Sequence, residues 1–202
     1  MVFYSLLVLA SLNVVVADFL NTAGVQSCLD SHNAYRSDLA QQKVKNGAGQ
    51  TMPGATDMNE LKYGKDLEAK AQDWAKQCPG MSHTPNANYG QNLFWSSAKL
   101  DHATAMKQAT ALWWKEVSLL KSNTTVVLTM EMFNQGVGHF TQMAQSKNTL
   151  VGCAVQSCSG TYVVCNYDGQ NWLNQPIYKT GTKTCSACDS TRKVCRNGLC
   201  AN

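Results

Sequence analysis

The chain has 202 residues, of which 44% are hydrophobic and 15% charged, and its formal net charge is +4. This length and apolar content exclude a disordered chain and allow a buried core. The excess positive charge lies in residues 179–202, where five basic residues are too widely spaced for a nucleic-acid-binding patch. We expect no nucleic-acid partner, and we favour a solvated tail over contact with a polyanion.

The first 17 residues form an uncharged apolar run, MVFYSLLVLASLNVVVA. Val15 and Ala17 are the small residues that a signal-peptidase site requires, so residues 1–17 predict a secretory signal peptide cleaved before Asp18. The alternative, a membrane anchor, needs about 20 apolar residues, and Asp18 ends the run early. No later stretch is apolar enough to span a bilayer. The sequence therefore predicts a secreted, extracellular protein with no transmembrane segment after signal removal.

Two amphipathic helices are predicted in the next part of the chain. Apolar residues recur at helical spacing between Val25 and Leu39. Residues 43–64 contain four of the 14 glycines and predict a long loop. Helical spacing returns between Leu67 and Cys78, and Pro79-Gly80 is expected to end this second helix.

A short strand and a third helix follow. A second loop carries His83, and Asn92 to Ser97 predict the strand. The third helix is predicted from Met106 to Leu120, and residues 124–129 are rich in β-forming residues. Asn123 begins the sequon Asn123-Thr124-Thr125, which predicts a glycoprotein with an exposed loop here.

The last part of the chain predicts a fourth helix, a strand pair and a polar tail. The helix is expected from Met132 to Ala144 despite its internal glycines. Residues 149–154 and 161–167 predict paired strands, and Pro176 begins a turn into the tail. Helices on either side of a small sheet predict an α+β fold.

Nine cysteines follow the predicted cleavage site. In an oxidising compartment most of them are expected to form disulfides. The odd number leaves at least one cysteine free, modified or bonded to a second chain. The four tail cysteines also have a spacing that suggests zinc, but the tail has no histidine, and we favour disulfides for Cys185, Cys188, Cys195 and Cys200.

Six short motifs occur in order along residues 25–178. They are His32-Asn33-x-x-Arg36-Ser37, Ala71-x-x-Trp74-Ala75-x-x-Cys78, Gly90-Gln91-Asn92-Leu93, Gly138-His139-Phe140-Thr141-Gln142-Met143, Val151-Gly152-Cys153-Ala154 and Tyr162-Val163-Val164-Cys165-Asn166-Tyr167. Together they resemble the CAP superfamily, which comprises cysteine-rich secretory proteins, insect venom antigens and plant pathogenesis-related proteins. The tail is most similar to the activation-associated secreted proteins of parasitic nematodes.

The resemblance implies a three-layer α–β–α sandwich stapled by disulfides. It implies a CAP domain over residues 18–178 and a cysteine-rich, hinge-like extension over residues 179–202. Cys78 is expected to pair with Cys158, and Cys153 with Cys165. In the tail, the spacing favours the pairs Cys185–Cys195 and Cys188–Cys200.

This pairing leaves Cys28 as the odd cysteine. Related proteins carry a further cysteine where this chain has Lys65. Two fates remain open: Cys28 bonds to a second chain, or it displaces a tail cysteine and frees a different thiol. We favour a thiol that reaches another chain, which predicts a disulfide-linked homodimer.

In the family, two histidines and two acids converge in a large surface cleft. The resemblance assigns these places to His83, His139, Glu116 and position 91, where this chain has Gln91. Two neutral imidazoles bind Zn²⁺ or a similar divalent cation. A glutamine accepts a hydrogen bond, but it carries no charge and cannot act as a general base. We expect His83 and His139 to be the metal ligands of a weakly bound cation, with no other cofactor.

These features predict a secreted, non-enzymatic CAP protein that acts by binding a protein or a small ligand. The family suggests an immunomodulatory role toward a host through an unidentified receptor. The first alternative is a metal-dependent hydrolase in the His83/His139 cleft, although the chain has no Gly-x-Ser-x-Gly or His-Glu-x-x-His motif. The second alternative is a sterol or fatty-acid binder. Residues 168–172 and Ala144-Gln145 depart from the family pattern, so they do not support this alternative.

Overall fold

The structure is a computed structural model that describes residues 19–122 and 126–202. The predicted signal peptide, residues 1–17, and the predicted glycosylation site at Asn123 lie outside the described residues. No helix in the described part of the chain has the length and apolar character needed to cross a membrane.

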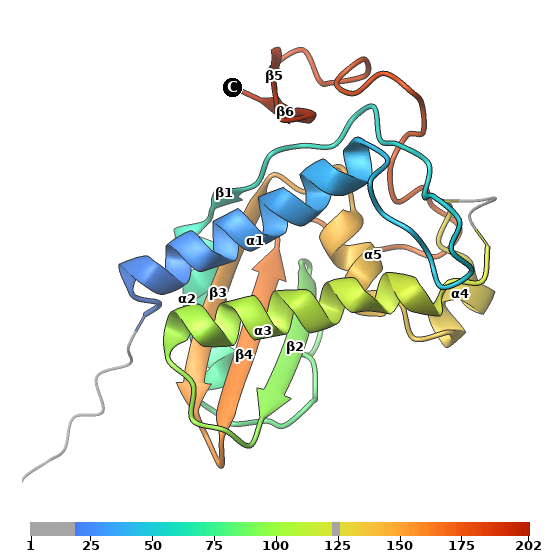
Figure 1. Ribbon diagram of the computed structural model, residues 1–202. Coiled ribbons are helices and arrows are strands. Elements are labelled where there is room, and N and C mark those ends of the chain that lie inside the picture. Colours follow the sequence, from blue (N-terminus) through green and yellow to red (C-terminus); the bar gives the residue numbers. More distant parts are fainter. Residues whose placement is uncertain (1–18, 123–125) are drawn as a thin grey trace, which may run out of the picture.

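A four-stranded sheet forms the middle layer of the fold (Figure 1). The strands lie in the order β1-β3-β4-β2, with β1 parallel to β3 and the other neighbours antiparallel. Every residue of β4 is buried, because the strand lies between two others and helices cover both faces. The strands are β1 (Lys62–Tyr63), β2 (Gly90–Ser96), β3 (Leu150–Ser157) and β4 (Thr161–Tyr167).

Helices form the two outer layers (Figure 1). One face is covered by α1 (Thr22–Ala40), α3 (His102–Lys115) and α5 (Gly138–Ala144), and the other by α2 (Lys65–Ala75). This arrangement confirms the expected α–β–α sandwich. Asn21 caps α1 by accepting from the backbone N–H of Gly24, as capping residues of this type commonly do.

The helix expected from Met132 to Ala144 is interrupted, so that prediction was wrong in its middle. The segment forms α4 (Met130–Asn134) and α5, separated by Gly136 at φ +84°. This left-handed conformation favours glycine and ends a helix. The break places His139 in the first turn of α5.

Three other predictions differ from the structure at element ends. The helix expected to reach Cys78 ends at Ala75, and Cys78 has φ +46°. The helix expected to reach Leu120 gives way at its C-terminus to a 3₁₀ turn, η1 (Glu116–Leu119). In the β-rich segment, described residue Val127 makes an isolated bridge to Pro176 and belongs to no strand.

Four disulfides form, and each joins the expected pair: Cys78–Cys158, Cys153–Cys165, Cys185–Cys195 and Cys188–Cys200. Cys28 is the free cysteine and is 0% exposed. No tail cysteine is displaced, so that alternative was wrong. The favoured interchain disulfide would require Cys28 to leave this position, because a fully buried thiol is not accessible to a second chain.

The cysteine-rich tail ends in a hairpin formed by β5 (Val194–Arg196) and β6 (Leu199–Ala201). Asn197 and Gly198 both have positive φ, as a two-residue hairpin turn requires. The hairpin lies against α1, where the hydroxyl group of Ser37 donates to the Asn197 carbonyl over 2.6 Å. Arg196 also pairs with Glu60 at 2.9 Å, so part of the tail's positive charge is engaged within the molecule.

The buried guanidinium of Arg36 ties α1 to the segment that follows α5. Arg36 is 0% exposed and donates to the carbonyls of Asn59, Met143 and Gln145 at 2.7–3.0 Å. Burial lowers its pKa to about 10, which still leaves the group charged at neutral pH. The first helix motif therefore stabilises the fold through hydrogen bonds to backbone carbonyls.

Candidate metal and ligand cleft

A cleft of about 690 Å³ lies at the end of the sheet where β2 begins and β4 ends. The loop before β2, β2 itself, η1, the α4–α5 region and the segment after β4 all contribute to it. The structure brings together all four residues that the resemblance assigned to the cleft: His83, Gln91, Glu116 and His139.

Glu116 holds His139 from two directions. His139 donates from Nδ1 to Oε1 of Glu116 over 2.6 Å, and its backbone N–H donates to Oε2 over 2.9 Å. The backbone N–H of Phe140 donates to the same Oε2 over 3.0 Å. The ring of His139 also stacks on the buried indole of Trp113, with the centroids 6.0 Å apart. The carboxylate and the indole together fix the orientation of this imidazole.

Gln91 holds His83 in a similar way but without charge. Nδ1 of His83 donates to Oε1 of Gln91 over 3.1 Å, and the backbone N–H of Thr84 donates to the same oxygen over 3.0 Å. Trp74 anchors the loop by donating from its indole N–H to the carbonyl of Ser82. His83 is exposed, whereas His139 is only 30% exposed. The cleft therefore has one outer and one inner imidazole.

These partners determine the tautomer of each ring. Carboxylate and amide oxygens only accept hydrogen bonds, so Nδ1 of both His83 and His139 carries the proton. Nε2 of each neutral ring then keeps its lone pair. A histidine that is anchored through one nitrogen in this way is typical of metal ligands, whose other nitrogen binds the ion. The donor set of two imidazoles fits Zn²⁺ or a similar divalent cation.

A network of amides, which sequence reasoning did not identify, supports Gln91 from below. The Nε2 group of Gln91 donates to Oγ1 of Thr84 and to Oδ1 of Asn166, each over 2.9 Å. Asn166 in turn donates to the carbonyl of Leu67. Asn166 belongs to one of the matched motifs, which is the only sequence signal that could have pointed to it. In the structure Asn166 lies directly opposite Gln91 in the pairing of β4 with β2.

A second supporting group lies under His139. Asn92 is 1% exposed and donates to the carbonyl of His139 over 3.1 Å and to the hydroxyl of Tyr167 over 3.3 Å. The Tyr167 hydroxyl donates to Nε2 of the buried His32 over 2.8 Å, and His32 donates from Nδ1 to the carbonyl of Cys28. Burial lowers the pKa of His32 to about 4, so this ring is neutral. His32 makes the buried hydrogen bonds expected for a structural histidine.

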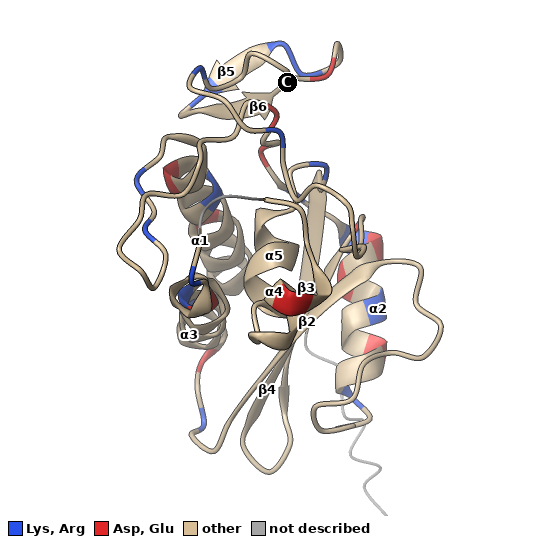
Figure 2. Cartoon of the chain, turned by 90° about the vertical axis from the view of Figure 1, so that its right-hand side faces the viewer, with Lys and Arg blue, Asp and Glu red and all other residues tan. Residues whose placement is uncertain are grey.

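The cleft is almost uncharged. The only charged side chain among its described lining residues is Glu116, whose two oxygens accept three hydrogen bonds. Strands β2, β3 and β4 and helix α5 carry no Lys, Arg, Asp or Glu, and the charged residues lie on other segments (Figure 2). Among the described lining residues there is no serine, cysteine or lysine that could serve as a nucleophile.

The Cysteine-rich secretory protein family, abbreviated CAP, matches residues 29–167. The chain belongs to the CAP family. This result confirms the resemblance drawn from the motifs. The matched range contains the four-stranded sheet and the cleft residues His83, Gln91, Glu116 and His139.

Individual relatives agree with this assignment. The CAP chain is 34% identical over 183 residues to the Ancylostoma secreted protein of Ancylostoma caninum; the match covers 86% of this chain but only 43% of that protein, so the chain spans less than half its length. It is 33% identical to Venom allergen 5 2 of Polybia paulista, over 74% of this chain and 76% of the allergen. The crystal structure of NaASP2 with Zn²⁺ has a TM-score of 0.82 at 34% identity, covering 91% of this chain and 98% of that one.

Proposed function

We propose that this CAP protein is secreted, that it acts by binding, and that its cleft holds a divalent cation between His83 and His139. One observation carries the metal assignment: both imidazoles donate from Nδ1 to an acceptor, which leaves both Nε2 atoms available. The similar structure of NaASP2, which contains Zn²⁺, supports the same choice of ion.

The expected affinity is low. A carboxylate that accepts from a ligating imidazole raises the basicity of the ring, and loss of such a partner typically weakens metal binding about 10–100-fold. Glu116 raises the basicity of His139 in this way, whereas the uncharged Gln91 only orients the ring of His83. When bound, the ion would supply a positive centre that attracts a ligand's oxygen or nitrogen atoms.

The arrangement favours binding over catalysis. A general base needs a carboxylate or imidazole that is free to take a proton. In the proposed metal-bound state the Nε2 atoms of His83 and His139 bind the ion, so neither imidazole is free. Glu116 already accepts three hydrogen bonds, and Gln91 cannot accept a proton at neutral pH. These contacts weigh against the alternative of a metal-dependent hydrolase.

Two exposed aromatic residues support contact with a protein or small ligand. Phe133 lines the cleft and is 51% exposed. Trp172 is 64% exposed and lines a second surface pocket, which shares Gln170 with the cleft. Exposed apolar groups of this size mark interaction surfaces. An unidentified receptor that contacts Phe133 and Trp172 is part of the proposal.

Secretion is supported by the four disulfides and by relatives named as a secreted protein and a venom allergen. Disulfides persist in oxidising compartments such as the extracellular space. The test is expression in a eukaryotic secretory system followed by N-terminal sequencing of the medium protein. A mature chain that begins at Asp18 supports the proposal, and protein retained in the cell with residues 1–17 still attached would overturn it.

The metal assignment is tested by calorimetric titration of the purified protein with ZnCl₂ at about pH 7.4, where free histidine is mostly neutral. We expect one site in the wild type and none in the double variant His83→Ala/His139→Ala. His102→Ala is the matched control, because His102 lies outside the cleft and accepts from the backbone of Asn21. No binding by the wild type, or binding that survives in the double variant, would refute the assignment.

A further inference from the structure

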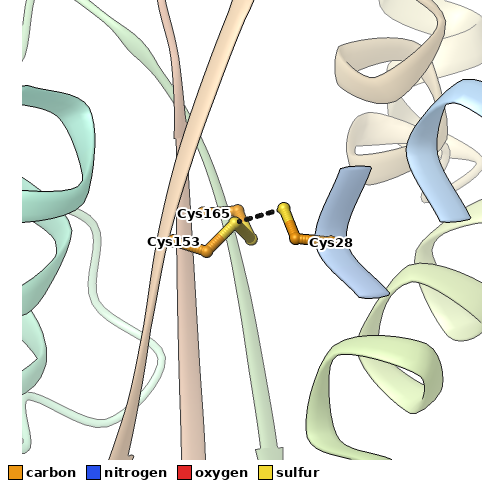
Figure 3. Close-up of side chains that lie close together, drawn as sticks. All are labelled: Cys28, Cys153 and Cys165. Atoms are coloured by element: carbon orange, nitrogen blue, oxygen red, sulfur yellow. Dashed lines mark hydrogen bonds between the residues drawn. A yellow bond between two sulfur atoms is a disulfide. The ribbon is translucent and has the colours of Figure 1, made fainter. Parts of the chain in front are cut away.

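The free thiol of Cys28 lies against a disulfide in the core (Figure 3). Its Sγ is 3.3 Å from Sγ of Cys153, which is bonded to Cys165. All three sulfur atoms lie within 4.8 Å of one another. A thiol at this distance from a disulfide is the arrangement from which thiol–disulfide exchange starts.

The position of the three cysteines isolates them from other thiols. Cys28 is on the face of α1 that packs on the sheet, and Cys153 and Cys165 face each other directly in β3 and β4. All three residues are 0% exposed. The other six cysteines are committed to three disulfides elsewhere in the chain. Within the folded protein, Cys28 is therefore the thiol that can reach this bond.

We propose that Cys28, Cys153 and Cys165 form an internal exchange site at which the core disulfide interconverts between Cys153–Cys165 and Cys28–Cys153. The Cys28 thiol loses its proton to hydroxide, and the thiolate attacks Sγ of Cys153. A bond forms between Cys28 and Cys153, while the Cys153–Cys165 bond breaks and its electron pair leaves on Cys165. Cys165 then takes up a proton from water. One thiol and one disulfide are present before and after, so no oxidant or reductant is required.

The surroundings of Cys28 slow the exchange. Burial raises the pKa of the Cys28 thiol well above its ordinary value, and the carboxylate of Glu68 on α2 raises it further. Other titratable groups that face this region are His32 on α1, Tyr63 on β1 and Tyr167 on β4, and none supplies a positive charge at neutral pH. Because the thiolate is the nucleophile, exchange is slow in the native state and accelerates with alkaline pH or loosening of α1.

The two disulfide isomers connect the layers differently. The Cys153–Cys165 bond joins two neighbouring strands, whereas a Cys28–Cys153 bond would fasten α1 to β3. One helical turn beyond Cys28, His32 is hydrogen-bonded to Tyr167, whose hydroxyl accepts from Asn92 beneath the cleft. The exchange would therefore change how α1 is anchored, and α1 is linked to the cleft residue Asn92 through these hydrogen bonds.

The first test maps the free thiol in the full-length secreted protein. Dilute protein is incubated at pH values between about 7 and 10, quenched with acid, unfolded without reductant and alkylated, and the labelled cysteine is identified by mass spectrometry. We expect label on Cys28 at neutral pH and a growing fraction on Cys165 at higher pH. The rate should rise about tenfold per pH unit, as the thiolate fraction does, and should not depend on protein concentration.

Label that stays on Cys28 alone at every pH would overturn the proposal. Label that moves to Cys153 would overturn the assignment of the attacked sulfur, because it would mean that Cys28 had bonded to Cys165. A rate that rises with protein concentration would replace the internal step with exchange between molecules.

A trap variant gives a second, independent test. Cys165→Ser leaves eight cysteines, and Cys28 and Cys153 should then pair spontaneously in air, so that a thiol titration of the unfolded protein finds none. Cys28→Ser is the matched control: it keeps the Cys153–Cys165 bond, also has no free thiol, and should show no label at any pH. Two persistent thiols in folded Cys165→Ser would overturn the proposal.

Discussion

The carboxylate of Glu116 accepts hydrogen bonds from both the side chain and the backbone of His139, at 2.6 and 2.9 Å. In the same cleft, Gln91 orients His83 through an amide oxygen at 3.1 Å. The two histidines are thus positioned by similar hydrogen bonds but differ by one full charge in their partners. That difference makes Gln91 the most informative residue to change.

Gln91→Glu should tighten zinc binding by about tenfold, because a charged acceptor raises the basicity of His83. The same change should lower the free energy of unfolding by about 1–3 kcal/mol, since the second carboxylate oxygen would face Oδ1 of Asn166, which now accepts from the amide. Calorimetric titration and urea denaturation measure the two effects.

Gln91→Ala is the control for this experiment, because it removes the hydrogen bond to His83 and should weaken zinc binding. If Gln91→Glu left the affinity unchanged or reduced it, the proposed role of the missing charge would be wrong.

The buried His32 should make stability depend on pH. Its pKa is lowered from 6.5 to about 4 in the folded protein, so the unfolded chain binds the proton more readily. The contribution of neutral His32 to the free energy of unfolding is fully present above about pH 6.5 and is lost as the pH falls through about 4. The total loss is about 3 kcal/mol. Urea denaturation of the wild type and of His32→Gln across this range measures the difference.

His32→Gln should show a flatter profile than the wild type between those two pH values, because it lacks the titrating ring. Two parallel profiles would show that another group causes the acid sensitivity.

Arg36→Met should lower the free energy of unfolding by about 3 kcal/mol or more, because it leaves several buried carbonyls without donors. Arg196→Met is the matched control. Arg196 is 55% exposed and pairs with Glu60, and an exposed ion pair contributes about 1 kcal/mol or less. Equal losses in the two variants, measured by urea denaturation, would contradict the role assigned to Arg36.

The buried position of Cys28 predicts a monomer on a non-reducing gel, in place of the disulfide-linked dimer that the odd cysteine count suggested. A thiol reagent should react with native protein far more slowly than with unfolded protein, which should show one thiol per chain. A dimer band that disappears on reduction and is absent in Cys28→Ser would contradict the buried position.

Local motifs were sufficient to identify the family, and the resemblance to that family then implied the three layers and the core disulfide pairs. The helical spacing in residues 25–39 and the strand pair predicted at 149–154 and 161–167 depend on neighbouring residues. The resemblance carried by the matched motifs placed His83, Gln91, Glu116 and His139 in one cleft. The interrupted helix at Gly136 was missed because apolar spacing on both sides continues through the break.

The sequence by itself determined which residues were expected in the cleft and that at least one cysteine would lack a partner within the chain. Only the tertiary structure decided how they are used: which nitrogen of each histidine is protonated, that Asn166 supports Gln91 from 75 positions away, and that Cys28 lies 3.3 Å from Cys153. These contacts join segments that are distant along the chain. Their geometry depends on how α1 and the strands pack together, and this packing cannot be predicted from the residues that neighbour each position in the sequence.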